Sequence, residues 1–184
     1  MATADGRITS AEALLRWEHP TLGIVAPHQL MAPDFAATVA AVLADTHTDP
    51  TLVTPEVTES VFLQDGKRAL VVLQDLKQLG VMLALDDFGT GYSALSYLMQ
   101  FPVDVVKIDQ SFIANLDGEP TGPLIVGAIV GLAHGLRMRV VAEGVESAAQ
   151  CEKVSALSCD AYQGFFFARL PRRPTAPRRC WPDT

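Results

Sequence analysis

The stretch Leu83–Leu95, LALDDFGTGYSAL, decides the fold prediction, because an apolar run ends in two adjacent aspartates and a glycine-rich turn follows. Apolar runs that end in a polar residue recur along the chain and alternate with helix-like segments. This alternation indicates βα units and a parallel sheet whose strands are buried on both faces. The sequence therefore predicts an α/β fold.

The expected strands are apolar runs, and the expected helices lie between them. The strands are predicted at Ala11–Trp17, Leu52–Thr58, Val81–Asp86, Val103–Ile108, Arg139–Ala142 and Ala161–Gln163. The helices are predicted at Asp34–Ala44, Gly66–Leu79, Ser93–Met99, Leu124–Leu136 and Ala148–Leu157. The clearest helical period has apolar residues at positions 70, 73, 76 and 79.

Each expected strand carries a polar side chain within it or at its end. These residues are Glu12, Glu56, Asp86 with Asp87, Lys107 with Asp109, Glu143 and Gln163. In a parallel barrel the carboxyl ends of the strands face one rim, where such enzymes carry their chemistry. We therefore expect these side chains to converge on one site.

The Asp86–Asp87 pair favours a metal site at that rim. Two close carboxylates repel each other unless a cation lies between them, and a two-metal centre uses ions about 3.5–4 Å apart. A helix-capping aspartate with a solvated neighbour would explain the pair alone. Glu56, Lys107 and Glu143 at matching positions favour the metal site, which an unrelated metal-dependent barrel enzyme would also fit.

Composition limits the classes of function. The 184 residues are 49% hydrophobic and carry a net charge of −7, as expected for one domain without the basic surface of a duplex nucleic-acid binder. The three cysteines lack metal-ligand spacing. The longest apolar stretch, Pro123–Leu136, is too short to span a bilayer. With no signal-like N-terminus, we expect a cytoplasmic protein without a membrane segment.

Six motifs in one order resemble the EAL domain, the bacterial cyclic-di-GMP phosphodiesterase family. They are EALLRW (Glu12–Trp17), EVTES (Glu56–Ser60), DDFGTGYSAL (Asp86–Leu95), VKID (Val106–Asp109), VVAEGVES (Val140–Ser147) and CDAYQGFFFARLP (Cys159–Pro171). The resemblance implies a TIM-like (β/α) barrel whose first strand runs antiparallel. It also implies hydrolysis of cyclic di-GMP to linear pGpG with two Mg²⁺ or Mn²⁺ ions.

The resemblance further implies a role for each matching residue. The metal ligands would be Glu12, Glu56, Asp86 and Asp87, with Asp86 bridging the two ions. The catalytic residues around the attacking water would be Lys107, Glu143 and Gln163. Substrate contacts would come from Arg16, Asp109 and Glu146, and Glu59 would anchor the loop after Asp87. The family also implies a homodimer through the Asp86–Tyr92 loop region.

The chain departs from the family in two places, so the expected barrel is incomplete. The first strand and an internal strand-helix section are missing, and Ile24–Ala26 stands where an N-x-S-type motif with a metal-binding asparagine is expected. The one asparagine of the chain, Asn115, follows the Lys107 strand and is no replacement. We therefore expect weakened metal binding and exposed sheet edges. Pro55 is a further concern, because it removes a hydrogen-bond donor from an expected central strand.

We expect a truncated EAL domain over residues 1–171 and a disordered Pro/Arg-rich tail over 172–184. Three hypotheses follow for its function. The domain is a cyclic-di-GMP phosphodiesterase, or a non-catalytic domain that binds cyclic di-GMP or a protein partner, or a remnant that folds poorly alone.

Overall fold

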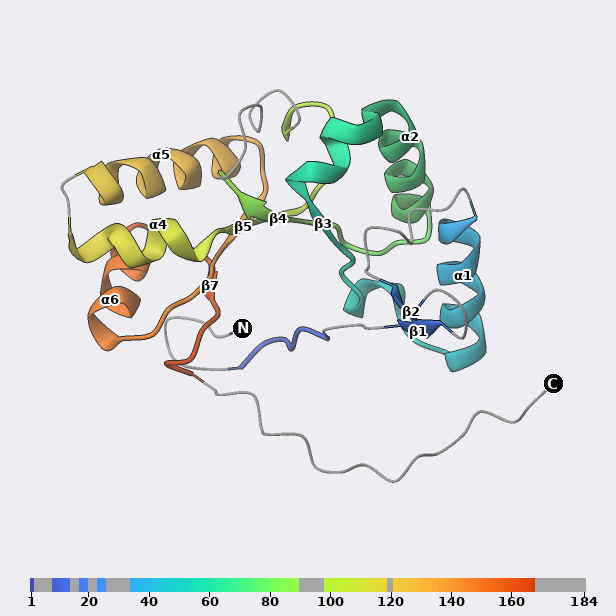
Figure 1. Cartoon of the computed structure of the whole chain (residues 1–184), viewed down its shortest axis with the longest axis horizontal. Helices are drawn as coiled ribbons and strands as arrows, with labels where there is room; N and C mark the ends of the chain where they lie inside the picture. Colours follow the sequence, from blue (N-terminus) through green and yellow to red (C-terminus); the bar gives the residue numbers. More distant parts are fainter. Residues whose placement is uncertain are drawn as a thin grey trace.

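A parallel sheet of five strands forms the centre of the protein (Figure 1). The computed structural model describes residues 1, 8–13, 17–19, 23–25, 34–89, 98–118 and 121–167. The strands, in spatial order, are β3 (Glu56–Thr58), β4 (Ala84–Phe88), β5 (Val105–Ile108), β6 (Arg139–Ala142) and β7 (Ala161–Tyr162). The predicted α/β class is confirmed.

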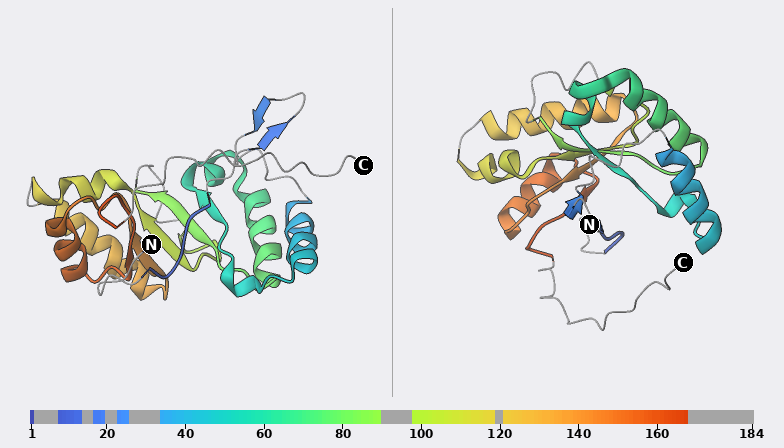
Figure 2. Two further views of the ribbon diagram at one scale, coloured as in Figure 1. Left: turned by 90° about the horizontal axis from the view of Figure 1, so that it is seen from below. Right: turned by 45° about the vertical axis from the view of Figure 1, so that its right-hand side comes forward.

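Helices cover the convex face of this curved sheet (Figures 1 and 2). They are α2 (Glu59–Gln78), α4 (Gln110–Ala114), α5 (Thr121–Gly135) and α6 (Ala148–Ala156), while α1 (Phe35–Thr46) packs outside α2. Two 3-10 helices, η2 (Pro50–Leu52) and η3 (Asn115–Asp117), lie in the connections. No helix in the described ranges is long and apolar enough to cross a membrane.

The two faces of the sheet differ because successive side chains of a strand point to opposite faces. Large apolar residues such as Leu85, Val106 and Ile108 belong to the main core, which the helices complete. The concave face carries a second cluster of mostly small residues, which are Ala84, Val105, Val141 and Ala161, with Met1 and Met82 packed against it. The small side chains leave the concave face open to the polar residues two positions further along.

Part of the barrel wall differs from the prediction. Ala11–Ala13 are in no strand, and Ala11 and Ala13 are exposed, so this segment lacks the burial that a parallel barrel strand needs. Trp17 instead begins β1 (Trp17–His19), which pairs with β2 (Gly23–Val25) in an antiparallel hairpin apart from the main sheet. The segment 8–13 crosses the concave side of the sheet (Figure 1).

The second predicted strand is shorter than expected. Residues 50–52 form η2, and β3 begins only at Glu56, directly after Pro55. Within the described part of the chain β3 pairs with β4 alone, and the Pro55 carbonyl accepts a hydrogen bond from Ala84 N at 3.0 Å. Pro55 therefore removes no donor from a central strand, contrary to the concern from the sequence. Most of the helix predicted at Ser93–Met99, and the whole tail 172–184, lie outside the described residues.

Candidate functional site

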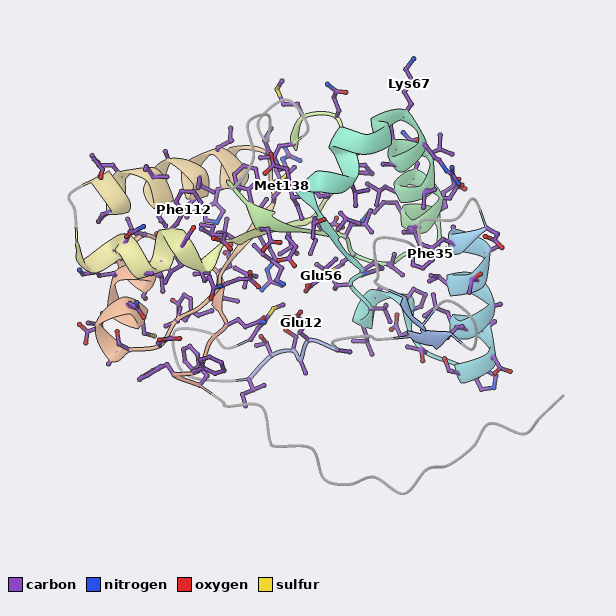
Figure 3. The ribbon with its side chains drawn as sticks, in the orientation of Figure 1. Glu12, Phe35, Glu56, Lys67, Phe112 and Met138 are labelled. Carbon is purple, nitrogen blue, oxygen red and sulfur yellow. The ribbon has the colours of Figure 1, made fainter. Side chains whose placement is uncertain are left out.

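A buried lysine stands at the centre of four carboxylates on the concave face. Lys107, 1% exposed, places Nζ 2.6 Å from Glu56 Oε2, 2.8 Å from Glu143 Oε1 and 3.0 Å from Asp86 Oδ1. Glu12 Oε2 lies 3.7 Å from the same nitrogen. Figure 3 shows Glu12 and Glu56 on opposite sides of this space, one on the segment 8–13 and one on β3. Residues that lie far apart in the sequence therefore share one cation.

Strand register explains why these side chains meet. Glu56 is paired with Ala84, and Lys107 lies two residues beyond Val105, the partner of Ala84 on β5. Glu143 and Gln163 each follow directly after their strands, two residues beyond Val141 and Ala161 of the concave cluster. The period of two in a strand thus turns each polar residue toward the same face as the small residue before it.

The two adjacent aspartates share a site because β4 contains a bulge. The register between β4 and β5 shifts between Leu85 and Phe88, and Asp87 has a left-handed backbone with φ of 55°. A bulge inserts one extra residue and re-aims a side chain, and aspartate tolerates this conformation better than most residues. Asp86, Asp87 and Glu143 consequently carry carboxylate oxygens that lie within 4.8 Å of one another.

The cluster brings four carboxylates to one lysine, and burial together with these charges shifts the pKa values of its members. Burial raises the pKa of Glu143 to about 7, assisted by the charges of Asp86 and Glu12 and opposed by Lys107. Burial also raises the pKa of Glu56. The pKa of Lys107 is raised as well: burial lowers it, but hydrogen bonds and charge interactions with the surrounding carboxylates outweigh that effect.

These residues fit a divalent cation. Burial and the neighbouring charges of Asp86 and Asp109 raise the pKa of Asp87, so further positive charge is favourable beside it. Asp86 Oδ1 is buried and accepts no hydrogen bond from the part of the chain that the structure describes, although Lys107 Nζ lies 3.0 Å away. Hard carboxylate oxygens are the ligands that Mg²⁺ and Mn²⁺ prefer.

Gln163 links the segment 8–13 to the sheet. Its Nε2 donates to Glu12 Oε2 at 2.5 Å, across 151 positions of sequence. The carboxylate of Glu12, which is held by no strand in the described residues, is thereby fixed near Lys107.

The remaining predicted site residues lie further from Lys107 or outside the described residues. Asp109 caps α4 by accepting a hydrogen bond from Ser111 N at 2.9 Å. Glu146 is exposed, and its backbone N–H donates to Gln150. Glu59 is buried at the start of α2, but Arg16 and residues 90–97 of the loop that Glu59 was predicted to anchor are not described. The substrate and anchoring roles of these residues stay predictions.

Asn115 does not substitute for a metal-binding asparagine. It is the C-cap residue that follows α4, is exposed, and donates from Nδ2 to the Ser111 carbonyl at 2.8 Å. The first turn of α4, in contrast, was not identified from the sequence, although Gln110 and Phe112 contact the two loops of the site. The sequence signal that could have indicated these contacts is a glycine two residues after Asp87 and another directly after Glu143.

Comparisons with a family model and with curated proteins lead to the same family. The model of the EAL domain family matches residues 26–170. The chain is 40% identical over 145 residues to the signaling protein YkoW of Bacillus subtilis, covering 79% of this chain and 18% of YkoW. It is 34% identical over 212 residues to the bifunctional diguanylate cyclase/cyclic di-GMP phosphodiesterase MucR of Pseudomonas aeruginosa, covering 90% of this chain and 31% of MucR. The chain thus spans less than a third of either relative.

Solved structures match over most of the chain. The PaMucR phosphodiesterase in complex with c-di-GMP has a TM-score of 0.76 at 32% identity and covers 91% of this chain and 87% of that chain. The manganese/cy-diGMP complex of Klebsiella pneumoniae BlrP1 has a TM-score of 0.72 at 31% identity. The match covers 78% of this chain and 37% of that chain. The fold therefore matches TIM-barrel structures of this type, with partial coverage.

Proposed function

Because the chain belongs to the EAL domain family, we propose that it binds cyclic di-GMP beside Lys107 and hydrolyses one phosphodiester bond to give linear pGpG. The observation that carries the proposal is the cluster of four carboxylates around one buried lysine, with Asp87 at its edge. Solved relatives that hold c-di-GMP, one of them with manganese, support the choice of ligand.

Two divalent ions, Mg²⁺ or Mn²⁺, are the proposed cofactors. Glu12, Glu56, Asp86 and Asp87 would hold them through carboxylate oxygens. When bound, such ions activate water and stabilise the oxygens that enter and leave the phosphorus.

The other residues of the site act on the water and the substrate. Lys107 keeps its positive charge at neutral pH and favours negative charge on an oxygen placed beside it. In this proposal Glu143, whose Oε1 lies 2.8 Å from Lys107 Nζ, accepts a hydrogen bond from the attacking water. Gln163 holds the Glu12 carboxylate in position. In this proposal Arg16, Asp109 and Glu146 contact the substrate, and Glu59 anchors the loop after Asp87.

One observation favours a second candidate, a domain that binds cyclic di-GMP without hydrolysing it. Asn115, the one asparagine of the chain, does not supply the family's asparagine ligand, because it lies on the far side of α4 from its start and donates to the Ser111 carbonyl. Losing a neutral ligand weakens metal binding but leaves the carboxylates and Lys107 in place. A homodimer through the Asp86–Tyr92 loop is compatible with either candidate.

The deciding experiment incubates the purified full chain with Mn²⁺ and cyclic di-GMP and follows pGpG by chromatography. The variant Asp86→Ala removes a proposed ligand, and Asp75→Ala removes an exposed carboxylate of α2 as a matched control. Product from the wild type and Asp75→Ala, with none from Asp86→Ala, supports the phosphodiesterase. Binding of cyclic di-GMP by calorimetry without product supports the second candidate, and absence of both rejects the proposal.

A further inference from the structure

The first turn of α4 lies between the two loops that follow Asp87 and Glu143. It begins at Gln110, three residues after Lys107, so β5 carries both the lysine and this turn. The Asp109 side chain caps the turn through Ser111 N. The position of the turn is therefore set by the same strand that sets Lys107.

Phe112 packs tightly against the loop after Asp87. Gly89 has φ of 100°, and a Cβ built there would lie 2.7 Å from Phe112 Cε2 and 2.9 Å from Cζ. Real Cβ atoms essentially never come so near another heavy atom, so the edge of the ring occupies the space that a side chain at position 89 would need. The ring thus limits how far the Gly89 backbone can move toward α4.

Gln110 makes the matching contact with the loop after Glu143. Gly144 has φ of 70°, and a Cβ there would lie 2.5 Å from Gln110 Cβ and 3.2 Å from Gln110 Cα. The backbone directly after Glu143 therefore rests against the first residue of α4. One short turn, which begins two residues after the Lys107 strand ends, touches both loops.

We propose that Gln110 and Phe112 form a positioning element that sets the separation of the Asp87 and Glu143 carboxylates. Those carboxylates belong to the trio with oxygens within 4.8 Å of one another, a separation that suits a shared cation. A small displacement of either loop changes this separation directly, because the contacts lie one and two residues from the carboxylates. The inference rests on the proposed function in so far as the trio binds a divalent cation.

The first test measures Mn²⁺ binding to the full chain by isothermal titration calorimetry, with the metal alone as the probe. Phe112→Ala removes the ring and is expected to weaken Mn²⁺ binding roughly tenfold, as for other residues that orient metal ligands. Phe112→Leu keeps part of the contact and is expected to lose less. Ile125→Ala is the matched control, because Ile125 of α5 lines the same cavity as Phe112. This variant is expected to bind Mn²⁺ like the wild type.

A second, independent variant comes from the other loop. Gly144→Ala places a methyl group against Gln110 and is expected to weaken Mn²⁺ binding by a similar factor. Gly131→Ala in α5 is its control, because a Cβ there meets nothing within 4 Å. If Gly144→Ala and both Phe112 variants bind Mn²⁺ as tightly as the wild type, the positioning role is wrong.

A metal-free measurement separates this inference from the proposed function. Hydrogen exchange of the Asp87–Gly89 amides, measured in EDTA, is expected to accelerate in Phe112→Ala and Phe112→Leu but not in Ile125→Ala. A wild type that binds no Mn²⁺ would overturn the metal-dependent function, while the exchange rates still test the contact. Equal exchange in Phe112→Leu, Ile125→Ala and the wild type would overturn the positioning role even if Phe112→Ala failed to fold.

Discussion

Lys107 is the residue on which the charge balance of the site depends. Its amine is almost fully buried and lies within 3.0 Å of oxygens from Glu56, Asp86 and Glu143. Removing one partner from a buried ionic cluster leaves uncompensated charge, which costs more than the pair contributes. The residue therefore matters for stability as well as for any chemistry.

We expect Lys107→Met to lower the free energy of unfolding of the metal-free protein by about 3–5 kcal/mol. Urea unfolding in EDTA measures this change. Lys67→Met is the matched control, because Lys67 of α2 points into solvent (Figure 3), and it is expected to change stability little. A loss below about 1 kcal/mol in Lys107→Met would show that the carboxylates take up protons instead of remaining charged.

Glu143 makes the stability of the metal-free protein depend on pH. Its pKa is raised from 4.5 in the unfolded chain to about 7 in the folded protein. Between these two pH values the folded protein keeps a proton on Glu143 that the unfolded chain has lost. This contribution is fully present below about pH 4.5 and is lost as the pH rises through about 7, on the order of 3 kcal/mol at 1.36 kcal/mol per pKa unit. We expect Glu143→Gln to flatten the decline between pH 5 and 8.

Urea unfolding in EDTA at a series of pH values checks this expectation. Glu152→Gln, at an exposed position of α6, serves as the control and should leave the decline unchanged. The same slope in Glu143→Gln and the wild type would mean that another group takes up the proton.

At the scale of elements, two matching contacts hold the amino-terminal ends of the strands. Asp104, just before β5, accepts from Leu83 N at 2.7 Å and pairs with Lys77 in the last turn of α2 at 2.8 Å. Asp160, just before β7, accepts from Val140 N at 2.7 Å and contacts His134 of α5 at 2.9 Å.

In both cases the basic residue precedes the donating amide by six positions. Each aspartate thereby connects one helix to two strands. The two contacts lie at the opposite ends of the strands from Lys107.

Removing either aspartate is expected to destabilise the fold without affecting the site. Asp104→Ala leaves the Leu83 amide just before β4 without its acceptor, and Asp160→Ala does the same to the Val140 amide of β6; each loss costs about 1–3 kcal/mol. Asp104→Asn and Asp160→Asn keep an acceptor oxygen and should lose less. Urea unfolding measures the loss, with the exposed Asp45→Ala of α1 as control, and Mn²⁺ affinity is expected to stay unchanged. A matching fall in affinity would show that the two ends of the strands are coupled.

At the scale of the whole molecule, the site connects the segment 8–13 to a sheet of which, among the described residues, it is not a strand. The segment 8–13 contacts β7 through Glu12 and Gln163, and Glu12 also approaches Lys107 of β5. Glu56 adds β3, at the other edge of the sheet within the described residues. A cation held by these carboxylates would therefore tie the segment 8–13 to the sheet.

Mn²⁺ is consequently expected to stabilise the entire fold. A ligand that binds only the folded state, at a concentration of 100 times its dissociation constant, adds about 2.7 kcal/mol. Thermal unfolding with Mn²⁺ and with EDTA measures this effect, which Asp86→Ala should abolish. An unfolding midpoint that does not respond to Mn²⁺ in the wild type would contradict a metal site of this kind.

The strands and the concave face could be predicted because they depend on local pattern. β6 was predicted to the residue, and β5 within two residues of its start. Glu56 was expected to close its strand, but β3 begins at Glu56. The prediction of a strand beginning at Ala11 was wrong for residues 11–13. Strand formation needs a neighbouring strand and burial, and the local sequence pattern does not report either of them.

By itself, the sequence determined the α/β class, the family and the face of the sheet on which the acids lie, since alternating side chains and the order of motifs are properties of neighbouring residues. The tertiary structure alone decided that Lys107 becomes the shared cation of four carboxylates and that a bulge turns Asp86 and Asp87 together. It also decided that α4 separates two loops of the site. These features depend on distances between residues that only packing brings together.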